Sequence, residues 1–282
     1  MQLLSWNIQW GRGMDGQVDP ARIIRTIRQL GEFDVICLQE VAVNFPGLPG
    51  SQGENQVAEL SAQLPGYTVI YGAATDIPNR HGGRSLFGNA IFTRLPVGQI
   101  WRHLLPWQAE LTTPSMQRVL VEAVVTADIG PLRIMTTHLE YYSQRQREIQ
   151  IDAIRCLHHE ACAMSQRKFL AEERGTTFEV FPRPAEAILC GDLNFPATAP
   201  EYAQILAPFS DGTSGFHDAW SVLNPCTPHA PTVGIHPVDF VDCPECYDFV
   251  LISSGLVKHL KMHGIDAETK ASDHQPVWIE LR

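Results

Sequence analysis

Strand-like and helix-like segments alternate along the chain. A largely apolar run at 3–6 and a fully apolar one at 35–38 predict buried strands, since a sheet covered on both faces shows no polar alternation. Between them, apolar residues recur at helical spacing across 23–30. Asp19-Pro20 would begin this helix as N-cap and first-turn proline, and Gly31 would end it.

The same rhythm continues to the last residues. Further strands are predicted at 67–71, 89–92, 119–126, 132–137, 187–190, 247–252 and 277–281, and further helices at 54–64 and from 143 to about 171. An antiparallel hairpin turned at 128–131 would join two of these strands. Hairpins and helical crossovers in one chain favour a layered α/β or α+β fold. No linker-like segment divides the chain, so we expect one domain spanning 1–282.

Composition sets limits on the class of protein. The chain has 282 residues, 44% of them hydrophobic, which is enough for a large core. Its longest apolar runs, such as 34–38, are far too short to cross a bilayer. Met1 leads almost directly into the first strand without the basic and apolar regions of a signal peptide, so we expect a cytoplasmic protein.

The net charge narrows the range of partners. Acidic residues outnumber basic ones by 31 to 21, which gives a formal charge of -10. Non-specific binding of duplex nucleic acid requires many Lys and Arg residues, so a processive DNA-binding enzyme is disfavoured. A local basic rim would still allow a nuclease. A lipid phosphodiesterase would need an exposed apolar hairpin or an amphipathic surface helix, and no segment predicts either convincingly.

Seven cysteines, an odd number, do not suit a secreted disulfide framework. Cys243 and Cys246 are separated by two residues, and Cys226, His229 and His236 precede them. Two thiolates at this spacing and one or two further ligands could form a structural zinc site. The simpler interpretation is that these are reduced thiols in a loop.

Polar residues lie where the apolar strands end or begin. They are Asn7, Glu40, His138, Asp192, Asn194, Asp248, Asp273 and His274. A layered fold brings strand ends from distant parts of the sequence into one cleft. A charged side chain beside a buried strand is costly unless it is paired or bound to a metal. Each residue alone could be a loop acid, a helix cap or a core histidine; together they predict a site.

These residue types suit the attack of water on phosphorus. Mg²⁺ prefers carboxylate and amide oxygens, with water and substrate phosphate completing its coordination. A carboxylate must orient or deprotonate the attacking water, while His and Asn donors stabilise the charged transition state. Glu40 is the best candidate metal ligand and Asp192 the best candidate base.

Five segments carry a family resemblance. They are Trp6-Asn7, Leu38-Gln39-Glu40, Thr137-His138-Leu139, Gly191-Asp192-Leu193-Asn194 and Ser272-Asp273-His274, in this order. Together they resemble the endonuclease/exonuclease/phosphatase superfamily over essentially the whole chain. The opening segment 7–16 is more similar to its bacterial hydrolases of uncertain substrate than to its DNA-repair enzymes. The resemblance implies a four-layer α/β/β/α sandwich, in which two mixed sheets lie face to face between flanking helices.

The resemblance also implies a metal site for one or two ions of Mg²⁺ or Mn²⁺. Glu40 would bind the metal, Asn7 would assist, and Asp273 would contact it directly or through water. Gln9 stands where the DNA-repair branch tends to carry an acidic residue or Asn, which puts a second ion in doubt.

The resemblance further implies catalytic roles at the same site. Asp192 would activate water, and Asn194 would hold both water and phosphate. His138 and His274 would contact phosphate oxygens, with Asp248 orienting His274. Whether Asp192 or His274 is the general base stays open.

The substrate is the least determined part of the interpretation. Arg118 could contact it, although an ordinary surface arginine is the alternative. The basic loop 80–84 could hold a phosphate through backbone amides and Arg84, or could simply be a mobile surface loop. We expect a phosphodiesterase or nuclease acting on nucleic acid or a small phosphodiester. A lipid or inositol-phosphate phosphoesterase is the alternative, and a zinc-dependent hydrolase or an inactive binding module on the same fold is more remote.

Overall fold

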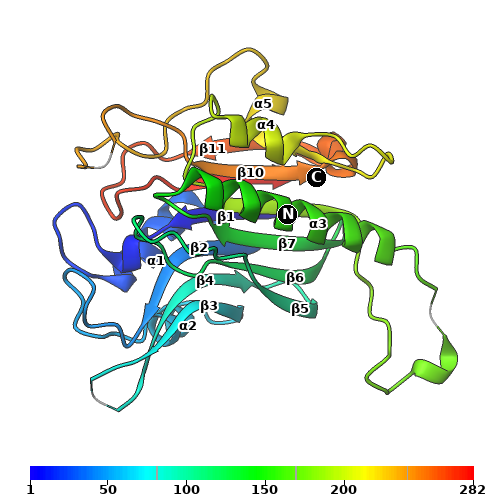
Figure 1. The fold of residues 1–282 in the computed structure, drawn as a ribbon, viewed down its shortest axis with the longest axis horizontal. Coiled ribbons are helices and arrows are strands. Elements are labelled where there is room, and N and C mark those ends of the chain that lie inside the picture. The colour runs from blue at the N-terminus through cyan, green and yellow to red at the C-terminus, as the bar shows by residue number, and fades with distance from the viewer. Residues whose placement is uncertain (81, 169, 240) are drawn as a thin grey trace.

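Two six-stranded sheets face each other in the computed structural model, which describes every residue except 81, 169 and 240 (Figure 1). In spatial order, the first sheet contains β11 (Leu260–Ile265), β12 (Val277–Leu281), β1 (Gln2–Asn7), β2 (Val35–Val43), β4 (Arg84–Thr93) and β3 (Thr68–Pro78). The second contains β5 (Val97–Leu104), β6 (Val119–Ala127), β7 (Gly130–His138), β8 (Ala187–Asp192), β10 (Asp248–Ser253) and β9 (Phe216–Asp218). Both sheets are mixed, because β1 pairs with β2 and β7 with β8 in parallel whereas the other neighbours are antiparallel.

Helices connect and cover the strands. They are α1 (Pro20–Leu30), α2 (Gln56–Gln63), α3 (Gln144–Met164), α4 (Pro200–Leu206) and α5 (Ala219–Leu223), with short 3-10 turns η1 (Gln9–Gly11), η2 (Ala171–Glu173) and η3 (Ser254–His259). The N-cap of α1 forms as expected, since Asp19 accepts a hydrogen bond from the Arg22 amide at 3.0 Å. Within the described residues, no helix combines the length and the apolar character needed to cross a bilayer.

The side-chain alternation of the strands produces four layers. On β1, Leu3 points into the core between the sheets, whereas Leu4 and Trp6 point outward to α1 and α2. On the second sheet, β6 packs alternate residues inward, and α3 and α4 cover the outer face. The chain ends lie side by side at the centre of the first sheet, where the Met1 amino group donates to Leu281 O at 2.8 Å. The predicted α/β/β/α sandwich is confirmed.

Several element boundaries differ from the prediction. The helix predicted to reach about 171 ends at Met164, which is exposed and has no core to pack against. The strand at 35–38 continues to Val43 across an irregularity in its pairing with β4. Five elements were not predicted: β5, β9, β11, α4 and α5. The strands β5, β9 and β11 lie at or next to sheet edges with mixed polar sequences, so they lack the apolar run that marks a central strand.

A buried polar network surrounds Arg133 near the start of β7, whereas His138 lies at the other end of this strand. Arg133, fully buried, donates to His158 Nδ1 at 2.7 Å and lies 3.5 Å from Glu122. His158 Nε2 lies 2.8 Å from Ser214 O, an acceptor, so Nε2 carries the single ring proton and Nδ1 accepts. Burial and the adjacent charge of Arg133 lower the pKa of His158 to about 4. The folded protein therefore requires a neutral His158.

This requirement makes stability depend on pH. The folded pKa of His158 lies below the ordinary value of 6.5, so the stabilisation is complete above pH 6.5 and is lost as the pH falls towards 4. The shift corresponds to about 3 kcal/mol. We expect His158→Gln, which can accept from Arg133 and donate to Ser214 without titrating, to flatten the fall in melting temperature over this window. The exposed His217→Gln serves as control, and an unchanged slope in His158→Gln would contradict the interpretation.

Candidate active site

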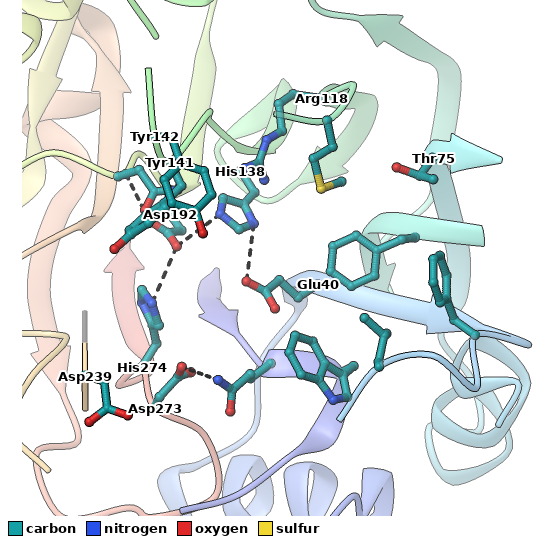
Figure 2. Close-up of a pocket in the computed structure, with 17 residues that line it drawn as sticks. Glu40, Thr75, Arg118, His138, Tyr141, Tyr142, Asp192, Asp239, Asp273 and His274 are labelled. Carbon is teal, nitrogen blue, oxygen red and sulfur yellow. Dashed lines mark hydrogen bonds and ion pairs between the residues drawn. The ribbon is translucent and has the colours of Figure 1, made fainter. Parts of the chain in front are cut away.

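The polar residues predicted at strand ends collect at one edge of the sandwich. Strands β1, β7 and β8 end there, β10 begins there, and β2 passes through it with an irregularity between Leu38 and Val41. The strand register places Asn7 beside Gln39, and both His138 and Asp248 beside Asp192. These residues border a cavity of about 700 Å³ (Figure 2). Among the residues singled out from the sequence, its wall includes Glu40, Arg118, His138, Asp192, Asn194, Asp273 and His274, whereas Asn7 and Asp248 lie buried beside it.

Glu40 reaches the cavity because β2 is irregular at this point. The pairing of β2 with β4 shifts between Leu38 and Val41, and Glu40 adopts a left-handed φ of 60°. Gln39 turns between the sheets instead, where its Nε2 donates to Thr136 Oγ1 at 2.9 Å. A non-glycine residue in the left-handed region is strained, and such strain is common at functional sites.

Asn7 connects two carboxylates of the site. Its Nδ2 donates to Glu40 Oε1 at 3.0 Å and to Asp192 Oδ2 at 2.9 Å. Its Oδ1 accepts from the Gln9 amide at 3.1 Å. Because the amide nitrogen faces Glu40, Asn7 in this arrangement fixes the Glu40 carboxylate rather than offering its own oxygen beside it.

Asp192 is held at the end of β8 by its neighbours. Its Oδ1 accepts from the Asn194 amide at 2.9 Å, and Asn194 Nδ2 donates to Leu139 O at 2.9 Å. The preceding residue must be glycine, because a Cβ on Gly191 would lie 1.9 Å from Thr137 O on the adjacent strand. The Gly-Asp-Leu-Asn segment therefore combines a close strand contact with a fixed carboxylate.

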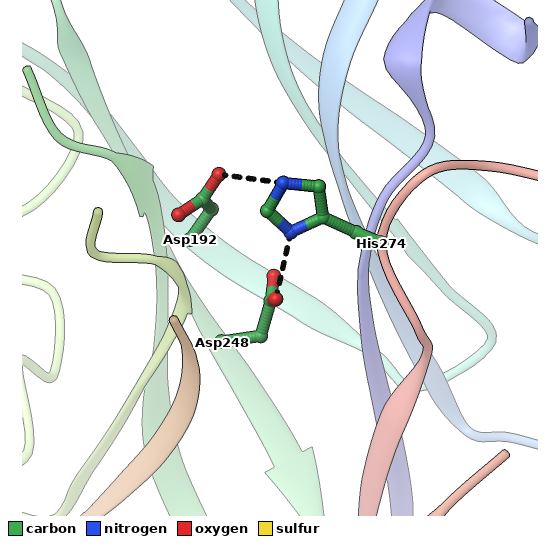
Figure 3. Close-up of side chains that lie close together, drawn as sticks. All are labelled: Asp192, Asp248 and His274. Atoms are coloured by element: carbon green, nitrogen blue, oxygen red, sulfur yellow. Dashed lines mark hydrogen bonds and ion pairs between the residues drawn. The ribbon is translucent and has the colours of Figure 1, made fainter. Parts of the chain in front are cut away.

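His274 lies between two carboxylates (Figure 3). Its Nδ1 is 2.8 Å from Asp248 Oδ2, and its Nε2 is 3.6 Å from Asp192 Oδ2. Asp248 Oδ2 also accepts from Thr232 Oγ1 at 2.7 Å. Burial opposes protonation, but the charges of Asp248 and Asp192 raise the pKa of His274 well above its usual value. The imidazole is therefore a cation at neutral pH, with an N–H directed to each acid.

His138 differs from His274 in charge. Its Nε2 is 3.4 Å from Asp192 Oδ2, and its Nδ1 is 3.7 Å from Glu40 Oε1. Burial lowers the pKa of His138 well below its usual value, and the charges of Arg118 and His274 add to this effect. His138 is thus a neutral donor. Arg118 is held at the cavity wall by a buried ion pair, with its Nε 3.3 Å from Glu140 Oε2.

Negative charge is crowded on this side of the cavity. Burial raises the pKa of Glu40 to about 7, and the charge of Asp273 adds to the rise. Burial also raises the pKa of Asp192 to about 6, although the charge of His274 opposes it. Asp273 accepts hydrogen bonds from Gln9 Nε2 and, at 3.2 Å, from Ser272 Oγ. His274 is the cation that lies between these acids, so the carboxylates are only partly neutralised.

This donor set fits a hard divalent cation. Glu40 and Asp273 bring carboxylate oxygens to the same cavity, and their mutual repulsion would be relieved by a positive ion. The group whose ligand atoms all lie within 4.8 Å of one another, in the described part of the chain, is a different one, formed by Asp192, Asp248 and His274. Both ring nitrogens of His274 face carboxylates there, so we interpret that trio as a proton-holding network.

Arg84, expected to contact the substrate, lies away from the cavity. Arg84 is exposed and pairs with Asp76 at 2.7 Å, and it does not line the cavity. Arg84 is the first residue of β4, directly after the turn of the β3–β4 hairpin. Its charge is balanced by Asp76 on the paired strand β3. Of the loop 80–84, His81 lies outside the described residues.

The cysteine-containing loop agrees with the simpler interpretation, reduced thiols, and not with the zinc alternative. Cys246 is buried and directs its Sγ to Asp248 O, whereas Cys243 is exposed. His229 pairs with Asp218, and His236 Nε2 contacts Thr269 O at 2.9 Å. Among the residues that the structure describes, no metal-ligating cluster contains these cysteines, which are reduced thiols.

Some residues of the site carried no functional signal in the sequence. Thr232 holds Asp248 and comes from an irregular segment without any motif. Glu140 holds Arg118, and only its position two residues after His138 hinted at the site. Gln9 was noted as a departure from the family pattern, and it binds Asp273.

A family profile and several solved structures match this chain. Residues 4–274 match the profile of the Endonuclease/Exonuclease/phosphatase family. A search of curated proteins gave no match. Among solved structures, an endonuclease/exonuclease/phosphatase from Beutenbergia cavernae is 21% identical with a TM-score of 0.67, covering 100% of this chain and 71% of that one.

Two further structures are similar over the full chain. A mannosyl-6-phosphatase from Bacteroides thetaiotaomicron is 20% identical with a TM-score of 0.64, covering 100% of this chain and 99% of that one. TDP2 of D. rerio, complexed with a single-strand DNA product, is 18% identical with a TM-score of 0.64. The match covers 100% of this chain and 98% of that one. Similarity at this level establishes the fold, and the different descriptions leave the substrate undecided.

The crowded carboxylates generate a prediction on stability. Glu40→Gln removes one repelling charge, so in EDTA we expect the variant to be more stable than the wild type by roughly 1–2 kcal/mol. Added Mg²⁺ should raise the melting temperature of the wild type, and this rise should be largely lost in the variant. Thermal melts with EDTA and with Mg²⁺ measure both effects.

Glu32→Gln provides the matched control, because the Glu32 side chain is 87% exposed. This variant should match the wild type both in its stability in EDTA and in the rise of its melting temperature with Mg²⁺. If Glu40→Gln were less stable in EDTA and kept the full response to Mg²⁺, Glu40 would not belong to a metal site.

Proposed function

The chain belongs to the endonuclease/exonuclease/phosphatase family, whose members hydrolyse phosphate esters, and from this premise we propose that it is a divalent-metal-dependent phosphodiesterase. One observation carries the proposal. Asp192 lies in the cavity between Asn7 and two imidazoles, beside the acidic pair Glu40 and Asp273. A base, donors for phosphate oxygens and oxygen ligands for a metal are thus within one site.

Asp192 is the proposed general base. Its pKa of about 6 leaves the carboxylate ionised at neutral pH. The same pKa is close enough to neutral pH for the carboxylate to accept a proton from water. The competing candidate, His274, holds its protons towards Asp248 and Asp192 and has no basic lone pair to offer. Asn7 and Asn194 keep the Asp192 carboxylate in one orientation, which favours a fixed position for the attacking water.

The remaining side chains are proposed to bind the phosphoryl group. His274 supplies a charged N–H from Nε2, whose distance of 3.6 Å to Asp192 is longer than a hydrogen bond, and His138 supplies a neutral one on the same side as Asp192. Arg118 lines the cavity with its Nε fixed by Glu140, which leaves its terminal nitrogens for phosphate oxygens. Mg²⁺ or Mn²⁺ bound by Glu40 and Asp273 would polarise the phosphoryl oxygen and offset charge on the leaving oxygen.

The charge of the cavity favours a substrate with few phosphates. Among the described residues that line the cavity, Arg118 is the only lysine or arginine. The acidic residues that line it are Glu40, Asp192, Asp239 and Asp273. A multiply phosphorylated inositol or a long nucleic acid would need several more cations. We therefore favour a small phosphodiester, or the end of a nucleic-acid strand, over an inositol polyphosphate.

Hydrolysis of bis-p-nitrophenyl phosphate tests the proposal. We expect activity that requires Mg²⁺ or Mn²⁺ and that falls about 10²–10⁴-fold in Asp192→Asn, since this change removes the base and keeps the shape. His274→Gln should lower kcat by a similar order, because it removes a cationic donor. Steady-state kinetics measure both.

Asp128→Asn, in the exposed turn between β6 and β7, is the control for Asp192→Asn and should retain full activity. Activity that survives chelation, or an Asp192→Asn enzyme as fast as the wild type, would overturn the proposed function.

A further inference from the structure

The side of the cavity remote from the catalytic acids is made of aromatic rings. Figure 2 shows Asp192, His274 and Asp273 on one side and Thr75 on the other, with Glu40 between them. Phe87 pairs with Thr75 across β3 and β4, so it belongs to the far side.

Two further rings pack on Phe87 and complete this side. The centroids of Trp10 and Phe45 each lie 6.4 Å from that of Phe87, and all three residues line the cavity. We call Trp10, Phe45 and Phe87 the aromatic wall.

The aromatic wall is held in place by backbone contacts. Trp10 has a left-handed φ of 42°, which is strained for a residue with a side chain. Its indole N–H donates to Pro49 O at 2.9 Å, and its carbonyl accepts from Gln56 Nε2 at 2.6 Å. The fold thus keeps an energetically unfavourable backbone conformation that sets this ring against the cavity. A ring fixed in advance loses little entropy when a ligand binds.

The chemistry of the wall differs from that of the catalytic side. Its three rings offer apolar surface and no charge, so they do not suit a second phosphate. An aliphatic group would gain from burial alone. A flat ring would gain in addition from tilted and edge contacts with the three rings, whose faces and edges carry opposite partial charge.

We propose that the substrate is a phosphodiester that carries an aromatic ring, and that this ring packs on the aromatic wall while the phosphate lies at Asp192. The inference rests on the proposed function and names the substrate class of the same site. The cavity of about 700 Å³ has room for a phosphate and a ring together. Either a nucleobase or a simple aryl group would supply the ring.

Three substrates with one leaving group isolate the effect of the ring. They are the p-nitrophenyl phosphodiesters whose retained group is methyl, cyclohexyl or phenyl. We expect kcat/KM for the phenyl ester to exceed that for the cyclohexyl ester by roughly three- to tenfold, as aromatic contacts add to burial. A phenyl ester no better than the cyclohexyl ester in the wild type would overturn the inference, even though its hydrolysis supports the proposed function.

Variants of Trp10 test whether the preference for the phenyl ester arises from the aromatic wall. Trp10→Leu, which keeps an apolar side chain, should bring the phenyl-to-cyclohexyl ratio close to one, and Trp10→Phe should restore part of it. Trp107→Leu is the matched control, because Trp107 is 53% exposed and does not line the cavity, and its ratio should equal that of the wild type. A ratio unchanged in Trp10→Leu would overturn the role of the wall. Phe45→Leu repeats the test if Trp10→Leu does not fold.

Binding measurements separate this inference from the proposed function. If none of the three esters is hydrolysed, the proposed function fails, and calorimetry with phenylphosphonate and cyclohexylphosphonate decides the ring preference by itself. Tighter binding of phenylphosphonate, lost in Trp10→Leu, would support the wall; equal binding would overturn it. Thymidine 5′-(p-nitrophenyl phosphate) distinguishes the two sources of the ring, since a kcat/KM above that of the phenyl ester indicates a nucleobase and a lower value indicates a simple aryl group.

Discussion

Repulsion among buried carboxylates governs the arrangement of this protein's active end. Glu40, Asp192, Asp248 and Asp273 come from four separate segments and meet where the central strands of both sheets end or begin. Removing such charges from water costs several kcal/mol each unless partners compensate. The imidazolium of His274 compensates for part of this negative charge. The negative charge that it leaves unbalanced is the reason that the site fits a divalent cation.

The sequence predicted this collection of residues because strand direction makes it unavoidable. Apolar runs marked the central strands, and a parallel pair such as β1 and β2 must bring its two carboxyl ends to one edge. Polar residues after such runs were therefore predictable as a group, and the resemblance of five segments, in this order, to the family implied the role of each. The contacts themselves were not predictable. That Asn7 joins Glu40 to Asp192 depends on a register and on an irregularity in β2 that no local pattern encodes.

What the sequence did not reveal depends on contacts between distant segments. Thr232 reaches Asp248 from an irregular stretch, and the rings of Trp10, Phe45 and Phe87 meet only after three separate segments have packed. Arg84 pairs with Asp76 and does not line the cavity, and a basic, glycine-rich loop has the same composition whether it binds phosphate or turns a hairpin. Edge strands were missed because half-exposed residues at such positions carry little apolar pattern.

The two sides of the cavity depend on each other physically. An aromatic surface opposite the acids keeps the local dielectric low, and a low dielectric strengthens each charge interaction near Asp192. The same burial is the largest cause of the raised pKa values of Glu40 and Asp192. A polar far side would hydrate these groups and bring both pKa values back towards those of free acids. An apolar wall that selects the substrate is therefore compatible with the raised pKa of Asp192, on which the proposed attack of water depends.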